Sequence, residues 1–175
     1  RWVMKSPPHM ENLKPLHAVY PDATVVITHR DPVAVIQSAI TMMAYADRLR
    51  RTAIDPEWLV TYWSDRVHRL LSSCVRDRDL VPADRGVDIS FHQLNGNEIT
   101  VLESLYDKAG VELTPGVRKR FARYLDDNPR GKHGNIRYDL RGHFGVTPED
   151  LRSRFGFYFD RFDVRPEVQG GSART

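Results

Sequence analysis

The sequence has a single cysteine, no long apolar run and no Walker-type phosphate loop, and each absence excludes a class of protein. The lone Cys74 cannot form an internal disulfide, which fits a reducing cytoplasm. No stretch reaches the roughly 18 apolar residues of a membrane-spanning helix, and the first residues show no signal-peptide pattern. The G-x-x-x-x-G-K-[S/T] pattern of P-loop kinases is absent. We therefore expect a cytoplasmic protein without a membrane span, and a kinase is disfavoured.

The length and composition are those of one globular domain. The chain has 175 residues, of which 41% are hydrophobic and 28% are charged, so it can bury a core and is not disordered. We expect residues 1–164 to form a single domain and residues 165–175 to be a disordered tail. The opening residues "RWVMK" read as a strand with no lead-in. We therefore expect the chain to be the C-terminal part of a longer domain.

Strands and helices alternate along the chain. Three apolar segments predict strands, at residues 1–5, 24–29 and 86–91. Apolar positions at helical spacing predict helices, at residues 8–20, 32–43, 56–77, 97–109, 114–125 and 147–156. The segment 24–29 is a β-branched run, which is typical of a strand buried on both faces of a parallel sheet. The alternation predicts an α/β layered fold with a parallel sheet.

Basic and hydroxyl side chains follow the first two predicted strands. Ligands of open α/β sheets bind beyond the carboxyl ends of the strands, which is where Lys5 and Arg30 stand. Arg30 can offer a planar fork of donors to a phosphate. The helix that starts after Asp31 adds backbone N–H groups, and Ser38 adds a hydroxyl from its second turn. Acidic side chains are scarce in both segments, so a metal–carboxylate site is disfavoured and a phosphate or sulfate site is predicted.

Each basic residue near these strands, taken singly, can have a structural role in place of binding an anion. Arg30 can form a local ion pair with Asp31, and His9 and His29 can be histidines satisfied within the fold. Cys74 lies in an apolar helical stripe, which favours a buried structural thiol over a nucleophile.

A basic segment from residue 114 to residue 145 could serve a different partner. It holds eight Lys/Arg against three Asp, an excess larger than the net charge of +3 of the whole chain. Such a segment can bind nucleic acid, or it can be a solvated helix face. Between Arg118 and Arg141 its only aromatic residues are Phe121, Tyr124 and Tyr138, too few for a platform on which bases stack. We therefore expect no nucleic-acid partner.

Several motifs together resemble one family. The residues "RWVMKSPPHMENLKPLHAVYPDATVVITHRDPVAVIQSA" closely resemble the central block of the sulfotransferase family, in its bacterial branch with W-V-x-K-S-P-x-H and H-R-D-P motifs. The segment "ISFHQLNGNEITVLESLYDKAGVELTP" resembles a later part of that family. The segments "NPRGKHGNIRYDL" and "FGVTPEDLRSRFGFY" resemble its C-terminal block. The likeness covers nearly the whole chain and implies a P-loop-NTPase-like three-layer α/β fold.

The resemblance also implies a reaction and a set of roles. The family moves a sulfuryl group from 3′-phosphoadenosine 5′-phosphosulfate (PAPS), a co-substrate, to a hydroxyl or an amine without a metal. By resemblance, Arg30 and Ser38 hold the 3′-phosphate of the donor, and Arg130 and Lys132 of the "RGKHG" loop close over it. Lys5 lies near the transferred group, and His9 is the candidate base. Fixed cations suit this chemistry because negative charge grows on the leaving phosphate.

The sequence also departs from the family. Some relatives have a histidine two positions after the lysine, where this chain has Pro7. Phe91-His92-Gln93 stands where relatives have Tyr-Glu-Asp, and no glycine- and Ser/Thr-rich loop of the kind that cradles the 5′-phosphosulfate is present. That absence leaves an alternative open: a catalytically inactive remnant that keeps a 3′-phosphonucleotide-binding or interaction role.

The acceptor and the assembly are not determined by these motifs. Small-molecule, carbohydrate and lipid acceptors all remain open. A parallel sheet without its first strand exposes apolar edges. We therefore expect the isolated chain to be marginally stable or to self-associate.

Overall fold

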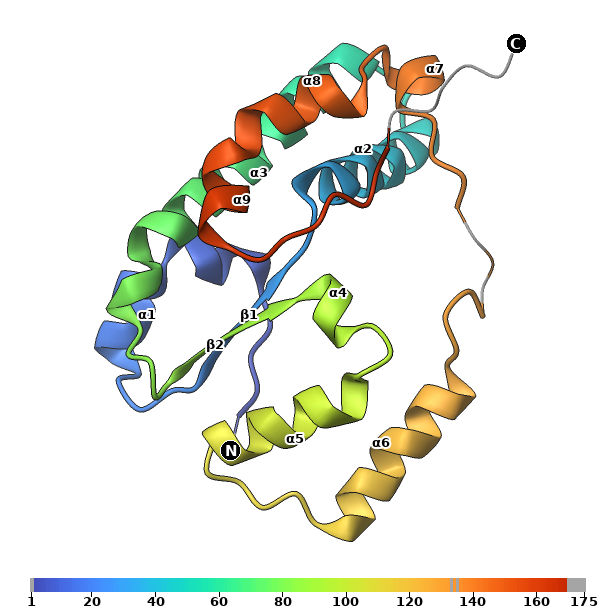
Figure 1. Ribbon diagram of the computed structural model, residues 1–175. Helices are drawn as coiled ribbons and strands as arrows, with labels where there is room; N and C mark the ends of the chain where they lie inside the picture. The colour runs from blue at the N-terminus through green and yellow to red at the C-terminus, as the bar shows by residue number, and fades with distance from the viewer. Residues whose placement is uncertain (1, 133, 135, 170–175) are drawn as a thin grey trace.

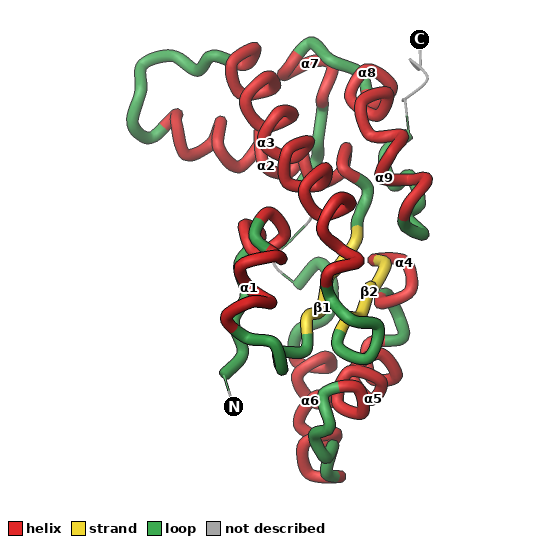
Figure 2. The backbone as a smooth tube through the Cα atoms, turned by 90° about the vertical axis from the view of Figure 1, so that its left-hand side faces the viewer, coloured by secondary structure: helices red, strands yellow, loops and turns green. Residues whose placement is uncertain are grey.

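The protein is an α/β structure built on a parallel pair of strands (Figure 1). The computed structural model describes residues 2–132, 134 and 136–169. Strand β1 (Val25–His29) pairs in parallel with β2 (Gly86–Ser90), in a register that aligns the first residues of both strands and their last residues. Helices lie on both sides of this sheet in Figures 1 and 2. The predicted α/β class with a parallel sheet is confirmed.

The helices form an upper and a lower group in both views (Figures 1 and 2). The upper group packs beyond the carboxyl end of β1 and consists of α2 (Pro32–Arg48), α3 (Pro56–Asp77), α7 (Leu140–Phe144), α8 (Pro148–Arg152), η3 (Ser153–Phe155) and α9 (Gly156–Arg161). The lower group consists of α5 (Glu98–Lys108) and α6 (Pro115–Asp127). The remaining short elements are η1 (Pro7–Glu11), α1 (Leu13–Val19), η2 (Arg78–Leu80) and α4 (Phe91–Leu94).

Side-chain caps fix where the long helices begin. Asp31 accepts a hydrogen bond from the backbone N–H of Val33 at the start of α2, and Asp55 accepts one from Trp58 at the start of α3. A proline occupies the first turn of both helices, where its missing N–H costs nothing. These are the helix starts that the sequence predicts.

Several predicted elements differ from the structure. The predicted helix 147–156 divides into α8 and η3, and α9 begins at Gly156. Residues 2–5 form no strand. The predicted helix 8–20 divides at Asn12 into η1 and α1, because Pro15 has no N–H to donate and is tolerated only in the first turn of a helix. The predicted strand 86–91 ends at Ser90, and Phe91 begins α4 through a capping box of Ser90 and Gln93.

The chain beyond residue 164 also differs from the expectation of a disordered tail, as far as it is described. The backbone N–H groups of Glu167 and Val168 donate to the carboxylate of Asp31. Residues 165–169 therefore make specific contacts with the start of α2, and residues 170–175 lie outside the described residues.

The core lies in the upper group of helices. Ile36 and Ile40 of α2 pack with Leu59 of α3 and with Phe155 and Tyr158 near the C-terminus. Cys74 is buried in the same core, and burial raises the pKa of its thiol to about 11. A neutral buried thiol is a packing group, as the sequence predicts.

The lower helices and one edge of the sheet are little covered. Every residue of α5 and α6 is described, and none is buried. Within the described residues, β1 pairs with β2 alone, and Val26 of β1 is 41% exposed. Trp2 and Val3 are 95% and 96% exposed. None of the described helices is at once long enough and apolar enough to cross a bilayer.

This exposure leads to a prediction about assembly. We expect the chain of 175 residues to self-associate, because an unpaired strand edge beside exposed apolar side chains is a template for pairing. The variant Val26→Lys, which puts a charge on the exposed face of β1, should shift the population toward monomer. Sedimentation velocity over a range of concentrations measures this. A wild-type chain that stays monomeric and melts cooperatively at high temperature would contradict the expectation.

Candidate anion site

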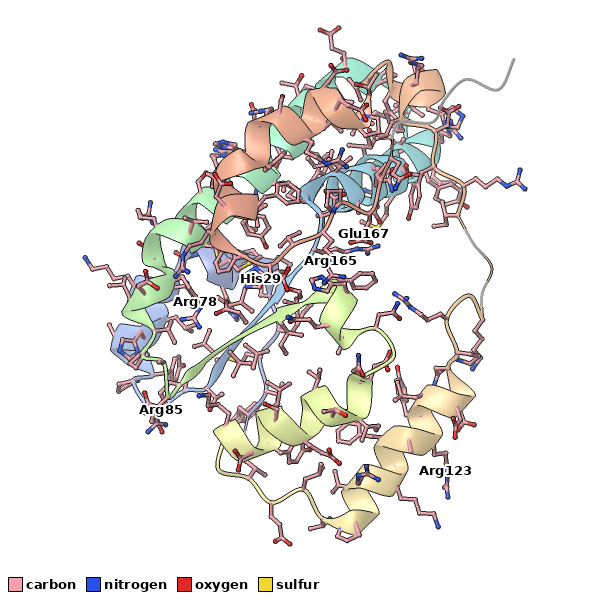
Figure 3. The ribbon with its side chains drawn as sticks, in the orientation of Figure 1. His29, Arg78, Arg85, Arg123, Arg165 and Glu167 are labelled. Atoms are coloured by element: carbon pink, nitrogen blue, oxygen red, sulfur yellow. The ribbon has the colours of Figure 1, made fainter. Side chains whose placement is uncertain are left out.

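Arg30 stands where β1 ends and α2 begins. Its guanidinium donates from Nε to both carboxylate oxygens of Glu167, each at 3.0 Å, and from Nη2 to Oε2 at 2.8 Å. This hydrogen bonding raises the pKa of Arg30 above its ordinary value, so the group is a permanent cation. Figure 3 shows Glu167, Arg165 and His29 together at the carboxyl end of the sheet. The position agrees with the prediction of a basic side chain at this edge.

Phe91 brings a second predicted residue to Arg30. The Arg30 guanidinium lies 4.2 Å from the centre of the Phe91 ring, and the Arg130 guanidinium lies 4.9 Å from the same centre. Arg130 is held in addition by a hydrogen bond from Nη1 to Oδ1 of Asn95, at 2.6 Å. A cation over an aromatic face is stabilised by the quadrupole of the ring. One ring at the start of α4 thus gathers two arginines that are 100 positions apart in the chain.

Tyr138 links the third predicted residue to the same place. Its hydroxyl donates to Oγ of Ser38, on the second turn of α2, at 3.5 Å. Tyr138 also lies close enough to Arg30 to contribute to the raised pKa of that arginine. Arg30, Ser38 and Arg130 therefore belong to one cluster, which we call the anion cluster.

The interactions of the described residues join none of the other three predicted residues to this cluster. Nζ of Lys132 donates to the backbone oxygen of Asp127 at 2.7 Å and to Oδ1 of Asn128 at 3.3 Å, which satisfies the C-terminal end of α6. Among the described residues, no side-chain hydrogen bond or ion pair joins Lys5 or His9 to Arg30, Ser38 or Arg130. Lys5 is exposed, and His9 lies in η1.

A side chain of the protein itself takes one of the N–H groups at the start of α2. The carboxylate of Asp31 is fully buried and itself accepts from the backbone N–H of Val33. Oδ2 of Asp31 also accepts from Arg152 at 3.3 Å. This negative charge satisfies the positive end of the helix dipole. The described residues show no ion pair between Arg30 and Asp31, and Arg30 pairs with Glu167 instead.

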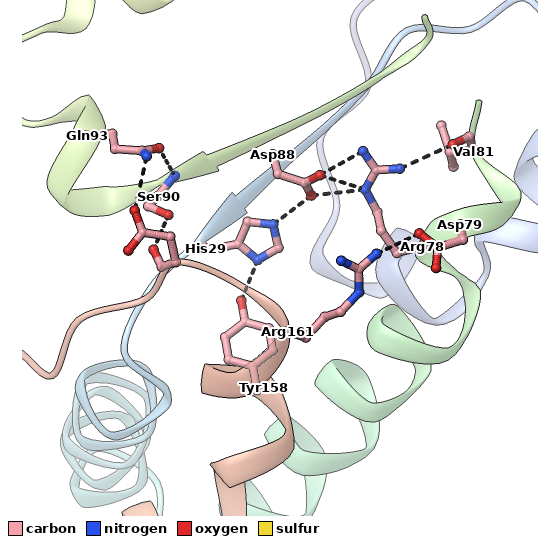
Figure 4. A network of polar contacts seen from close by, with 10 residues as sticks. His29, Arg78, Asp79, Val81, Asp88, Ser90, Gln93, Tyr158 and Arg161 are labelled. Carbon is pink, nitrogen blue, oxygen red and sulfur yellow. Dashed lines mark hydrogen bonds and ion pairs between the residues drawn. The ribbon is translucent and has the colours of Figure 1, made fainter. Parts of the chain in front are cut away.

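His29, the residue before Arg30, is a satisfied structural histidine, one of the roles that the sequence leaves open. Its Nε2 lies 2.8 Å from Oδ1 of Asp88, and its Nδ1 lies 2.7 Å from the hydroxyl of Tyr158 (Figure 4). A neutral ring that donates to the carboxylate and accepts from the hydroxyl satisfies both contacts. Burial raises the pKa of Tyr158, so its hydroxyl keeps its proton.

Arg78 completes this network, in which His29, Arg78 and Tyr158 are buried and Asp88 is partly open to solvent. It forks onto the carboxylate of Asp88, from Nε at 3.0 and 2.9 Å and from Nη2 at 2.7 Å. Burial works to raise the pKa of Asp88, but the hydrogen bonds from His29 and Arg78 outweigh it and lower that pKa to about 2. The network of Arg78, Asp88, His29 and Tyr158 fixes the end of β1, from which Arg30 projects.

A small pocket adjoins Arg30. His29, Arg30, Phe91 and Glu167 are among its lining residues, and it encloses about 30 Å³. That space suits a water molecule rather than a phosphate. In the part of the chain that the structure describes, no three His, Cys, Asp or Glu side chains are placed to hold a metal ion.

Glu167, Phe91 and the partners of His29 were not predicted as parts of the site. Glu167 lies in the segment expected to be disordered, so no local pattern identified it. Phe91 could have been predicted as a site residue, because it stands where relatives have a tyrosine. No local sequence pattern indicates that Arg78 pairs with Asp88, because this contact between η2 and β2 forms only in the folded chain.

Comparisons with known proteins agree with this architecture. A family model of the sulfotransferase family matches residues 1–115. The chain belongs to the sulfotransferase family. Its structure is similar to the crystal structure of sulfotransferase STF9 from Mycobacterium avium, with a TM-score of 0.82 and 24% sequence identity over 96% of this chain. It is also similar to sulfotransferase STF1 from Mycobacterium tuberculosis, with a TM-score of 0.74 and 25% identity over 90% of this chain.

This sulfotransferase-family chain spans less than half the length of those two solved relatives. The matched part is 43% of the Mycobacterium avium chain and 40% of the Mycobacterium tuberculosis chain. A search of curated proteins found no match.

The ion pair of Asp88 with Arg78 predicts how a single carboxylate affects stability. Asp88→Asn keeps the shape but removes the charge that pairs with Arg78, and because the Asp88 side chain is 35% exposed we expect the free energy of unfolding to fall by only about 1–2 kcal/mol. Urea denaturation measures this loss. The control Asp84→Asn changes an exposed carboxylate whose ion pair with Arg85 is long, at 3.6 Å, and should leave stability nearly unchanged.

Acid should have a matching effect. The pKa of folded Asp88, about 2, lies below its ordinary 3.8, so its stabilising contribution is complete above pH 3.8 and is lost as the pH falls toward 2. The difference in stability between the wild type and Asp88→Asn should therefore shrink between pH 4 and pH 2. A constant difference over that range would contradict the assignment.

Proposed function

We propose that this chain carries the 3′-phosphate-binding part of a PAPS-dependent sulfotransferase. The anion cluster carries the proposal: Arg30 at the carboxyl end of β1 shares the Phe91 ring with Arg130, and Tyr138 joins Ser38 to them. A cluster with two guanidiniums and a hydroxyl suits a phosphate, which takes both charge and hydrogen bonds. Membership of the sulfotransferase family supports the choice of donor.

The residues present fit one end of the donor. Arg30 and Ser38 would hold the 3′-phosphate, with Arg130 and Lys132 of the following loop closing over it. Lys132 would first have to release the C-terminal end of α6. Phe91, at the edge of the cluster, offers an aromatic face where relatives have a tyrosine.

The reaction assigns roles to further residues. When bound, the donor supplies the sulfuryl group, and its 5′-phosphate is the leaving group. Lys5 would neutralise charge near the transferred group, and His9 would accept the proton of the attacking hydroxyl or amine. The acceptor would be a small molecule, a carbohydrate or a lipid, and the reaction would take place in the cytoplasm without a metal.

A second candidate function is a binding module without turnover. It is favoured by the separation of Lys5 and His9 from the described contacts of the anion cluster. The two functions predict the same nucleotide binding and differ in sulfate transfer, so an assay with radiolabelled donor and a panel of hydroxyl and amine acceptors distinguishes them.

Calorimetric titration with 3′-phosphoadenosine 5′-phosphate tests what the two functions share. We expect the wild type to bind this nucleotide and Arg30→Ala to bind it about 10- to 100-fold more weakly, because one charge-assisted contact with the 3′-phosphate is lost. Adenosine 5′-phosphate, which lacks that phosphate, should bind weakly to both proteins.

Arg123→Ala is the matched control. Arg123 is an exposed arginine on α6, and Figure 3 shows it pointing away from the cluster, so its loss should leave the affinity unchanged. Equal weakening in both arginine variants would indicate general electrostatic attraction in place of a site. No binding by a folded wild-type chain would refute the proposed function.

A further inference from the structure

We infer that Glu167 sets the affinity of the anion cluster for its ligand, by competing with the 3′-phosphate for Arg30. The inference rests on the proposed function and adds a residue to it. It begins from the contact itself, in which Arg30 presents Nε and Nη2 to a carboxylate. The same edge of a guanidinium is the one that binds a phosphate with two parallel hydrogen bonds. Glu167 and a phosphate therefore seek the same donors.

The pocket leaves no room for both anions. Glu167 and Arg30 both line it, and it encloses about 30 Å³. Its lining holds two arginines, Arg30 and Arg165, and two acidic residues, Asp31 and Glu167. A doubly charged phosphate placed against Arg30 would stand beside the Glu167 carboxylate, and like charges at close range repel. Binding at this edge of Arg30 thus requires Glu167 to turn away.

The backbone holds Glu167 in place independently of its side chain. The N–H of Glu167 donates to Oδ2 of Asp31 at 2.8 Å, and the N–H of Val168 donates to the same oxygen at 3.3 Å. Arg152 contacts that oxygen and also donates to the backbone oxygen of Val168 at 2.5 Å. A substitution of the Glu167 side chain therefore removes the competing charge and leaves this anchor intact.

The Glu167 side chain can move without breaking the core. It is 26% exposed, and the Arg30 side chain is 45% exposed. An ion pair that is open to solvent to this degree contributes little stability. The contact can thus be exchanged for a ligand while the fold remains unchanged.

The experiment compares the binding of 3′-phosphoadenosine 5′-phosphate to the wild type, Glu167→Gln and Glu167→Ala by calorimetry. Both variants remove the competing carboxylate, and we expect each to bind about tenfold more tightly than the wild type. The control Glu149→Gln neutralises an exposed carboxylate on α8 and should bind as the wild type does. Thermal melting of each variant verifies that it is folded.

A double variant ties the gain to Arg30. In an Arg30→Ala background, Glu167→Gln should bring no gain, because the competition is for that guanidinium. A gain that persists without Arg30 would show a general charge effect and overturn the inference.

The remaining outcomes separate this inference from the proposed function. Unchanged affinity in both Glu167 variants overturns the inference alone, since the wild type still binds. Weaker binding also overturns it and makes Glu167 a residue that orients Arg30 for the ligand. No binding by any folded protein refutes the proposed function, and the inference with it.

Discussion

The buried carboxylate of Asp31 joins the start of α2 to Arg152 and to residues 167 and 168. It caps α2 through Val33, accepts from the backbone of residues 167 and 168, and pairs with Arg152 of α8. A fully buried charge is costly unless its hydrogen bonds are satisfied. Because these donors come from three parts of the chain, the start of α2 and the last described residues must come together. The placement of Arg30 and Glu167 depends on this constraint.

A second polar network stabilises the strand from which Arg30 emerges. Arg78 belongs to η2, Asp88 to β2 and Tyr158 to α9, and His29 ends β1. The network joins the sheet to the C-terminal helices at the point where a two-stranded sheet has little apolar packing of its own. The two networks hold the backbone next to Arg30 and Glu167, whose side chains are partly exposed.

The anion cluster combines rigid and exchangeable parts. Phe91 lies against both guanidiniums, and each arginine has its own hydrogen-bond partner, Glu167 for Arg30 and Asn95 for Arg130. A more strongly charged anion could replace these contacts. In the proposed function the affinity would therefore reflect the difference between two sets of contacts.

The sequence by itself determined the helix starts at Asp31 and Asp55, the β1 strand, the α/β class and the place of Arg30 at the end of β1, because caps, β-branched runs and motifs act over a few residues. A family resemblance added Ser38 and Arg130 as candidates. Only the tertiary structure decided which of these residues meet, because Phe91 and Tyr138 join segments about 100 positions apart. It likewise decided that the Asp31 carboxylate contacts Arg152 and the backbone of residues 167 and 168, and that Glu167 pairs with Arg30. Long-range pairing of single charges leaves no periodic pattern in a sequence, so these contacts appear only when the chain has folded.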